Sequence, residues 1–369
     1  MYEKVIIKIL QNVVFCDKIN KMAFVSKIIV KNITIIFINN FYKKSTRSAI
    51  KGDDIMNKIT IIGAGHVGAT IAYTLTIRGV ASEIVIIDIN EEKAYGEAMD
   101  INQGVAFCDP CNVYAGSYED AIGSDIVVIA SGIARRPDQT RLELAQTNVD
   151  ILKSITPKIT KIAPDAVYLL VSNPVDVLTY VFTKISGIPK RKIIGSGTLL
   201  DTARLRSRIS EIYSINQRNV HAYVLGEHGD SSFIPWSIAN ISNVPIAECD
   251  QFYLEGYRKG TELNYEKIED YVHQSGGMVI SSKGATFYAV SASISNICEC
   301  LLGGIDTTKT VSTMLDGEYG LSDVCLSTLC VLGHNGIRNM VNLPLNEEEI
   351  AKLHKSANQL KDTISKIKY

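Results

Sequence analysis

The sequence lacks a surplus of charge of either sign, although 21% of its residues are charged. It contains 38 Lys and Arg against 39 Asp and Glu, so its formal net charge at pH 7 is −1. Without a basic surplus the chain has no general attraction to nucleic acids or to anionic membranes. We therefore expect no nucleic acid partner and no membrane partner, and any affinity for anions must be local.

Cysteine is scarce and poorly spaced for metal binding. Eight cysteines are scattered along 369 residues, and their close spacings are Cys108-x-x-Cys111 and Cys298-x-Cys300. A zinc site needs a second pair, or histidines at ligand spacing, and neither pair has such a neighbour. We expect reduced thiols, no metal site and a cytoplasmic location.

Residues 1–50 contain no glycine and no proline, and they keep neither a helical nor an alternating apolar period. Thirty of them are Ile, Lys, Asn, Phe or Tyr, the bias that results when AT-rich DNA is translated. The longest apolar stretch, 28–38, falls short of the roughly 18 to 20 residues that span a bilayer, and no signal-peptide cleavage site follows it. We expect Met56 to be the native start and 1–55 to be an extension outside the core. A membrane anchor and a partner-binding arm are the alternatives.

A glycine-rich turn is the first strong feature that the sequence does contain. The stretch KITIIGAGHVGATIAYTLTIRGV has the pattern of an apolar strand, a turn and an amphipathic helix, and a second strand, EIVIID, ends at Asp88. A lone GxGxxG is a weak signal, but this one follows a strand, opens a helix and precedes an acid at the expected distance. Those are the requirements of a dinucleotide-binding fingerprint.

Each residue of this fingerprint has a physical reason to be there. Gly63 permits the tight turn, Gly65 lets a pyrophosphate reach backbone N–H groups at the positive helix end, and Gly68 lets helix and strand pack closely. We count Val67, in the same turn, among the cofactor-binding residues. Asp88 should bind the adenosine ribose and repel a 2′-phosphate, which favours NAD over NADP. A glycine turn in some other α/β protein is the alternative.

Strands and helices alternate after the fingerprint, and the chain is long enough for about two domains. Further apolar strands are expected at 112–116, 125–131, 166–172 and 192–197. This order predicts an α/β fold of the Rossmann type, with a doubly wound parallel sheet, followed by a mixed α+β substrate domain. We place the NAD-binding domain at 56–198 and the catalytic domain at 199–369.

One histidine and one Asp–Arg pair are the candidates for proton transfer and carboxylate binding. LGEHGDSSFIPW places His228 in a loop, and GTLLDTARLR places Asp201 and Arg204 one helical turn apart. A carboxylate fixes the tautomer of an imidazole and stabilises its charged form, and an arginine fork binds a carboxylate by two parallel hydrogen bonds. Taken alone, however, these residues also fit a structural histidine and a surface ion pair.

Five motifs together resemble the lactate/malate dehydrogenase family. GAGHVG, SNPVDVLTY, GSGTLLDTARLR, GEHGDS and KGATFYAV occur in the family's order and approximate spacing, from Met56 to the C-terminus. The resemblance implies an NAD-dependent oxidoreductase that transfers a hydride between the cofactor and a small 2-oxo or 2-hydroxy acid. An NAD-binding protein without turnover is the remote alternative.

The resemblance also implies the roles of individual residues. His228 would donate and accept the proton, and Asp201 would orient it. The other implied contacts are Arg204 at the substrate carboxylate, Arg141 on a mobile loop at the reacting carbonyl, Asn173 at the nicotinamide and substrate, and Thr286 beside the substrate.

The loop GIARRPDQTR bears on which acid is the substrate. Malate-type members usually carry Arg at the position of Arg135, whereas lactate-type members carry Gln. Facing the methyl group of pyruvate, this arginine would be a desolvated charge without a partner, at a cost on the order of several kcal/mol. GEHGDSSFIPW, GTLLDTARLR and Thr286 are lactate-type, however. We therefore expect L-lactate dehydrogenase activity, with malate dehydrogenase activity as the main alternative.

Arg206 and His221 match two positions at which bacterial lactate dehydrogenases bind the activator fructose 1,6-bisphosphate across a subunit interface. The resemblance therefore implies a homotetramer with an allosteric anion site. Ordinary surface and interface residues are the alternative interpretation of this pair.

Overall fold

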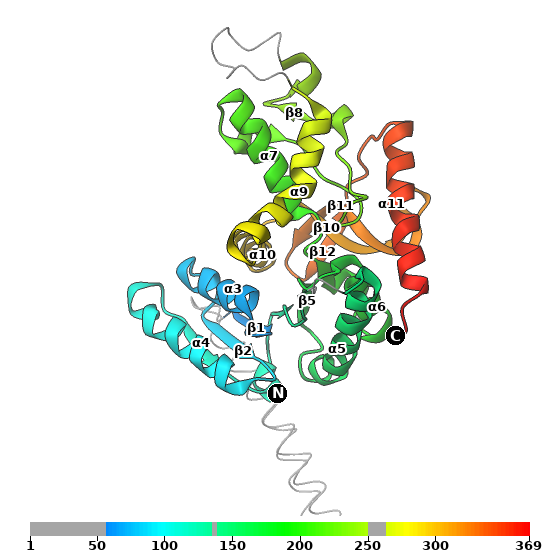
Figure 1. Ribbon diagram of the computed structural model, residues 1–369. Coiled ribbons are helices and arrows are strands. Elements are labelled where there is room, and N and C mark those ends of the chain that lie inside the picture. Colours follow the sequence, from blue (N-terminus) through cyan, green and yellow to red (C-terminus); the bar gives the residue numbers. More distant parts are fainter. Residues whose placement is uncertain (1–56, 135–138, 250–262) are drawn as a thin grey trace, which may run out of the picture. The chain divides into compact units, whose positions relative to one another are not determined.

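A nine-stranded sheet forms the centre of the computed structural model, which describes residues 57–134, 139–249 and 263–369 (Figure 1). The strand order is β12-β11-β10-β6-β5-β4-β1-β2-β3. The six strands nearest the N-terminus pair in parallel, and their order is that of the Rossmann fold. They are β1 (Lys58–Ile62), β2 (Glu83–Ile87), β3 (Asn112–Ala115), β4 (Ile126–Ile129), β5 (Val167–Leu170) and β6 (Ile193–Gly195). The predicted doubly wound sheet is confirmed.

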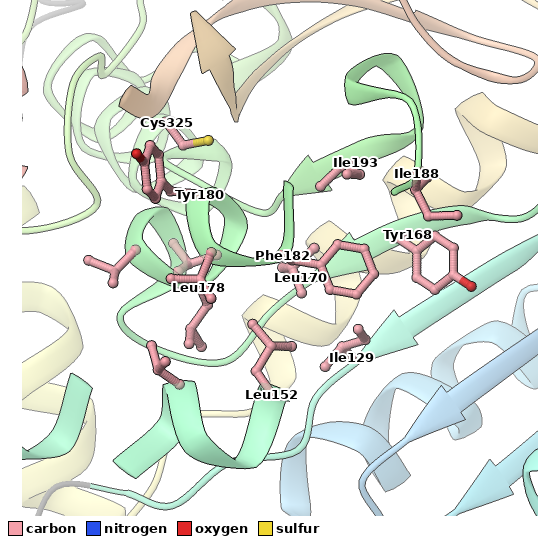
Figure 2. Packing of buried hydrophobic residues seen from close by; sticks show 14 of the residues in the cluster. Ile129, Leu152, Tyr168, Leu170, Leu178, Tyr180, Phe182, Ile188, Ile193 and Cys325 are labelled. Carbon is pink, nitrogen blue, oxygen red and sulfur yellow. The ribbon is translucent and has the colours of Figure 1, made fainter. Parts of the chain in front are cut away.

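Helices cover both faces of the parallel strands, which explains why those strands are mostly apolar. One face packs against α3 (His66–Ile77), α4 (Glu91–Gly104) and α10 (Tyr288–Leu302). The other face packs against α5 (Arg141–Ile162), α6 (Val175–Ile185) and α11 (Glu347–Ser365). Figure 2 shows this second core, where Leu152 and Phe182 from the helices lie beside Ile129 and Leu170 from the strands.

The C-terminal half is mixed, as predicted. Strand β10 (Thr307–Asp316) joins the sheet antiparallel to β6, and β11 (Ser322–Gly333) and β12 (Gly336–Met340) continue it. A second, three-stranded sheet contains β7 (Val220–His221), β8 (Asn240–Ile241) and β9 (Val244–Pro245), next to α7 (Leu199–Tyr213) and α9 (Tyr265–Lys283). Strands from both predicted domains thus share one sheet, and the boundary between 198 and 199 stays a prediction.

Short 3-10 helices complete the described secondary structure, at Val105–Phe107, Tyr118–Ala121, Lys190–Lys192, Gln217–Asn219, Trp236–Ile238, Ile246–Glu248 and Glu318–Gly320. Across the described ranges, we find no helix with the length and apolar character of a membrane span. The same part of the chain holds no group of three or more His, Cys, Asp or Glu side chains arranged to bind a metal ion. The predictions about 1–55 lie outside the described residues.

The fold brings three loops to one edge of the sheet. Strands β1, β4 and β5 are neighbours and run parallel, so their carboxyl ends meet. The glycine turn follows β1, the arginine-rich loop follows β4, and the SNPVD motif follows β5. Ligands bind at this edge in sheets of this type.

Candidate active site

The glycine turn between β1 and α3 depends on two close backbone contacts. Gly63 has a φ of +112°, which favours glycine, and a Cβ there would lie 2.7 Å from the backbone nitrogen of Ser131. A Cβ on Gly68 would lie 1.8 Å from the carbonyl oxygen of Gly63. Larger residues are therefore excluded at both positions.

Gly65, in contrast, borders open space. It immediately precedes α3, and a Cβ on it would meet no heavy atom of the described chain within 4 Å. The first N–H groups of a helix have no partner inside the helix, and the helix dipole makes this end positive. Open space in front of such donors fits the pyrophosphate of a dinucleotide. Val67, in the first turn of α3, is half-buried against the core.

Asp88 connects the end of β2 to the glycine turn. Its Oδ2 accepts a hydrogen bond of 2.6 Å from the backbone N–H of Ala64, and its Oδ1 accepts one of 2.9 Å from Asn90. The side chain is only half-buried, so the carboxylate remains accessible. A fixed acceptor at this place suits the hydroxyl groups of a ribose.

His228, Asp201 and Arg204 form one hydrogen-bonded chain. His228 Nδ1 and Asp201 Oδ2 are 2.6 Å apart, and Arg204 Nη1 donates to Asp201 Oδ1 at 2.8 Å. Asp201 is 7% exposed. Its place in the first turn of α7 suits a negative charge, because the N-terminus of a helix is positive. The loop that carries His228 is closed at its base by two hydrogen bonds between the backbones of Leu225 and Phe233.

The charges of this chain support one another. Burial disfavours the imidazolium of His228, but the carboxylates of Asp201 and, to a smaller extent, Asp176 together outweigh burial and raise the pKa of His228 to about 9. Burial likewise acts against ionised Asp201, but His228 and Arg204 together hold its pKa below the ordinary value. At neutral pH His228 is therefore charged beside an ionised carboxylate, and it can give a proton to a developing alkoxide.

Arg141 is the first residue of α5, which begins in a capping box formed by Thr140 and Glu143. Its Nη2 lies 2.7 Å from Asp230 Oδ2. Asp230 follows His228 by two residues, so this ion pair places Arg141 at the loop of the histidine. The side chains are 67% and 77% exposed, so water screens the pair, and its two partners can separate at little cost.

Asn173 and Thr286 lie in two loops of the site. Asn173 lies between β5 and α6, and its carbonyl oxygen accepts a hydrogen bond of 2.6 Å from Asn148 Nδ2. Thr286 lies between α9 and α10 and is half-buried. Its neighbour Phe287 stacks on His66 of the glycine turn, with ring centroids 5.5 Å apart.

Two family models match nearly all of the chain outside 1–55. The lactate/malate dehydrogenase NAD-binding domain matches residues 57–195, and the α/β C-terminal domain of that family matches 198–369. The chain belongs to the lactate/malate dehydrogenase family. It is therefore an NAD-dependent oxidoreductase of 2-hydroxy acids, with NAD as its cofactor. The family resemblance, the enzyme class and the cofactor expected from the motifs are confirmed.

Individual members of the family are similar over most of the chain. The L-lactate dehydrogenase of Acetivibrio thermocellus is 45% identical over 315 residues, which are 85% of this chain and 98% of that protein. The L-lactate dehydrogenase of a Thermoanaerobacter species is 46% identical over 313 residues, which are 85% of this chain and 99% of that protein.

Solved structures of lactate dehydrogenases are similar as well. One, from a deep-sea metagenome library, has a TM-score of 0.81 at 37% identity and is matched over 99% of its length and 85% of this chain. The minor L-lactate dehydrogenase of Enterococcus mundtii has a TM-score of 0.80 at 35% identity, with the same coverage of both chains.

The predicted anion-binding residue Arg206 shares α7 with Asp201 and Arg204 but has different partners. Arg206, in α7, donates from Nε to the carbonyl oxygen of Ala222 at 3.0 Å and stacks over Tyr223, 5.3 Å from its ring centre. His221, beside Ala222 in β7, is exposed. The carbonyl group of Ala222, the residue after His221, thus fixes the Arg206 side chain near His221. Arg135 lies outside the described residues.

Two acids at this site were not among the predicted residues. Asp176 Oδ2 accepts a hydrogen bond of 2.7 Å from the backbone N–H of His228, and Asp230 pairs with Arg141. Both lie inside motifs that the sequence analysis quoted, SNPVDVLTY and GEHGDS. The motifs therefore contained the signal, but nothing in their spacing indicates which partner each acid meets.

Proposed function

We propose that the protein is an L-lactate dehydrogenase that interconverts pyruvate and L-lactate in the family's active site. The observation that carries this proposal is the hydrogen-bonded chain of His228, Asp201 and Arg204, which joins a proton donor to a carboxylate-binding group. The similarity to L-lactate dehydrogenases over 85% of the chain supports it.

Reduction of a 2-oxo acid needs a hydride donor, a fixed carboxylate, a polarised carbonyl and a proton. Bound NADH supplies the hydride. The N-terminus of α3 beyond Gly65 would hold the cofactor pyrophosphate, and Asp88 would hold the ribose. Asn173 and Thr286, at the neighbouring loops, would contact the nicotinamide and substrate.

Arg204 would bind the substrate carboxylate, and His228 would give its proton to the carbonyl oxygen. Asp201 already holds one side of the guanidinium, which leaves the other N–H groups for a ligand. Gly276 of α9 packs beside it, since a Cβ there would lie 3.6 Å from Arg204 Nη2. In the oxidative direction neutral His228 would accept the proton, so the two directions have opposite pH dependence near the pKa of about 9.

Arg141 would leave Asp230 and polarise the reacting carbonyl when substrate binds. The exchange costs little because the ion pair with Asp230 is exposed. Closure of residues 132–144, which include the start of α5, would exclude water and strengthen the remaining electrostatic interactions.

The second candidate is malate dehydrogenase activity, which Arg135 favours. The deciding experiment compares kcat/KM for pyruvate and for oxaloacetate in the parent protein and in Arg135→Gln. We expect the parent to prefer pyruvate. If Arg135 faces the substrate, its removal should move the ratio towards pyruvate by about 10²-fold or more, the effect of one charged hydrogen bond of roughly 3 kcal/mol.

Arg136→Gln is the matched control, because it removes an equal charge one residue along. A similar shift in both variants would indicate a general charge effect rather than a substrate contact. A parent that prefers oxaloacetate would overturn the lactate proposal while leaving the fold, the cofactor and the family unchanged.

We also propose a cytoplasmic homotetramer of fermentative glycolysis that fructose 1,6-bisphosphate activates at Arg206 and His221. Free thiols at Cys108, Cys111, Cys298, Cys300, Cys325 and Cys330 support the location. Activation requires tighter binding to the active state, so the effector should lower the apparent KM for pyruvate, and inorganic phosphate should imitate it weakly. Activation that persists in His221→Ala would exclude this site.

A further inference from the structure

A second carboxylate lies against His228, and the proton relay proposed above does not use it. Asp176 is in the first turn of α6 and is 2% exposed. Its Oδ2 accepts the backbone N–H of His228 at 2.7 Å, across 52 residues of sequence. Asp201 therefore holds the ring of the histidine, and Asp176 holds its main chain.

A buried carboxylate is a costly way to hold one N–H group, because a neutral acceptor would serve as well. Asp176 Oδ1 is also buried and has no hydrogen-bond partner among the described residues. Only Oδ2 therefore has a hydrogen-bond donor in the described chain, and that donor is the main chain of the residue that bears the imidazole.

We propose that Asp176 is a positioning residue that fixes the loop of His228 and whose negative charge helps to keep the imidazole protonated. This inference rests on the proposed role of His228 as proton donor. Asp176 itself does not take part in the proton transfer.

The electrostatics agree with this role. Burial raises the pKa of Asp176 to about 6, against the opposing effects of the nearby Ser312 hydroxyl and of His228. Asp176 is thus mostly ionised above pH 7, throughout the range in which His228 titrates. After burial and Asp201, the Asp176 charge is a further contribution to the pKa of His228, and it acts to raise it.

Other charged or ionisable side chains lie on the elements around this loop, and each must stay constant in a test. Asp201 and Arg204 of α7 act on the imidazole together with Asp176. Glu227 and Asp230 belong to the loop of the histidine, Arg141 of α5 pairs with Asp230, and His273 of α9 contacts Ser232. Single substitutions at Asp176 leave all the others in place.

The test uses two variants of Asp176 in the full-length protein. Asp176→Asn keeps an oxygen that can accept the His228 N–H but removes the charge, whereas Asp176→Ala removes both. We expect Asn to lower the basic midpoint of kcat/KM for pyruvate reduction by about half a pH unit or more, with KM for NADH unchanged. Ala should also lower kcat by about tenfold or more, since the loop is no longer held.

Glu349→Gln is the matched control. Glu349 is 4% exposed, and it accepts hydrogen bonds from the backbone N–H and the hydroxyl of Ser237, beyond the far end of the same loop. It too is a buried carboxylate that holds this region, but it belongs to α11, away from the imidazole. A merely structural role predicts the same midpoint in parent, control and Asp176→Asn, and that result would overturn the proposal.

A titration of the His228 imidazole by NMR in the free protein separates this proposal from the proposed function. The midpoint should fall in Asp176→Asn and stay unchanged in Glu349→Gln, whether or not pyruvate is the substrate. An unchanged NMR midpoint in Asp176→Asn refutes the role of the charge, while a protein without pyruvate turnover but with the shifted midpoint refutes only the proposed function.

Discussion

The glycine turn and the proton relay lie at the same edge of the sheet but are built in opposite ways. The turn consists of residues 63–68, which are consecutive in the chain. Whether a side chain is tolerated at each of its glycines depends on the space around an added Cβ. The relay joins Asp201 to His228 across 27 residues and His228 to Asp176 across 52. The first site depends on backbone shape and the second on side-chain chemistry, so they should respond differently to substitution.

The largest effect is expected in the relay. His228→Asn removes the proton donor while keeping a side chain of moderate size, so turnover with pyruvate or oxaloacetate should fall by at least about 10²-fold. NADH binding should stay nearly intact, because the expected cofactor-binding residues lie in the glycine turn and at Asp88 and Asn173 and do not include His228. Single-turnover kinetics and the quenching or enhancement of NADH fluorescence measure the two effects. Retained turnover would remove His228 from the mechanism.

Substitutions in the glycine turn should have a smaller effect than His228→Asn, and Gly68→Ala is the control for Gly65→Ala. Gly65→Ala adds a Cβ in open space, so the free energy of unfolding should hardly change, while the Kd for NADH should rise by about tenfold, or roughly 1.4 kcal/mol. Gly68→Ala adds the same group against a carbonyl oxygen and should instead destabilise the fold by about 1 to 3 kcal/mol. Thermal denaturation and NADH titration distinguish the two.

If both alanine variants lost the same free energy of unfolding, Gly65 would be as tightly packed as Gly68. The contrast between the two positions would then be wrong. If Gly65→Ala bound NADH as tightly as the parent, the pyrophosphate would not approach the chain at that residue.

The smallest effect is expected from deleting 1–55. These residues show no core-forming pattern, and the family models begin at residue 57. The truncated protein should therefore keep its unfolding temperature and its kcat/KM for pyruvate. Loss of folded protein on truncation would show that residues 1–55 contribute to folding, in addition to the glycine turn and the proton relay compared above.

Local patterns were sufficient for the elements whose residues follow one another in the chain. The strands of the parallel sheet could be predicted because most of them are short apolar runs, buried on both faces. The glycine turn could be predicted because its strand, turn and helix are contiguous. The family resemblance added the activity class, which the matching models confirm. The roles of single residues stay predictions.

By itself the sequence determined the α/β class, the cofactor turn and the family, since those depend on short-range spacing and on motif order. Only the tertiary structure decided that Asp176 holds the main chain of His228, that Arg141 meets Asp230, and that β10 continues the parallel sheet beyond β6. These contacts depend on where distant segments pack and in which register they pair. The spacing of residues along the chain does not determine this packing or register, because many packings are compatible with the same local pattern.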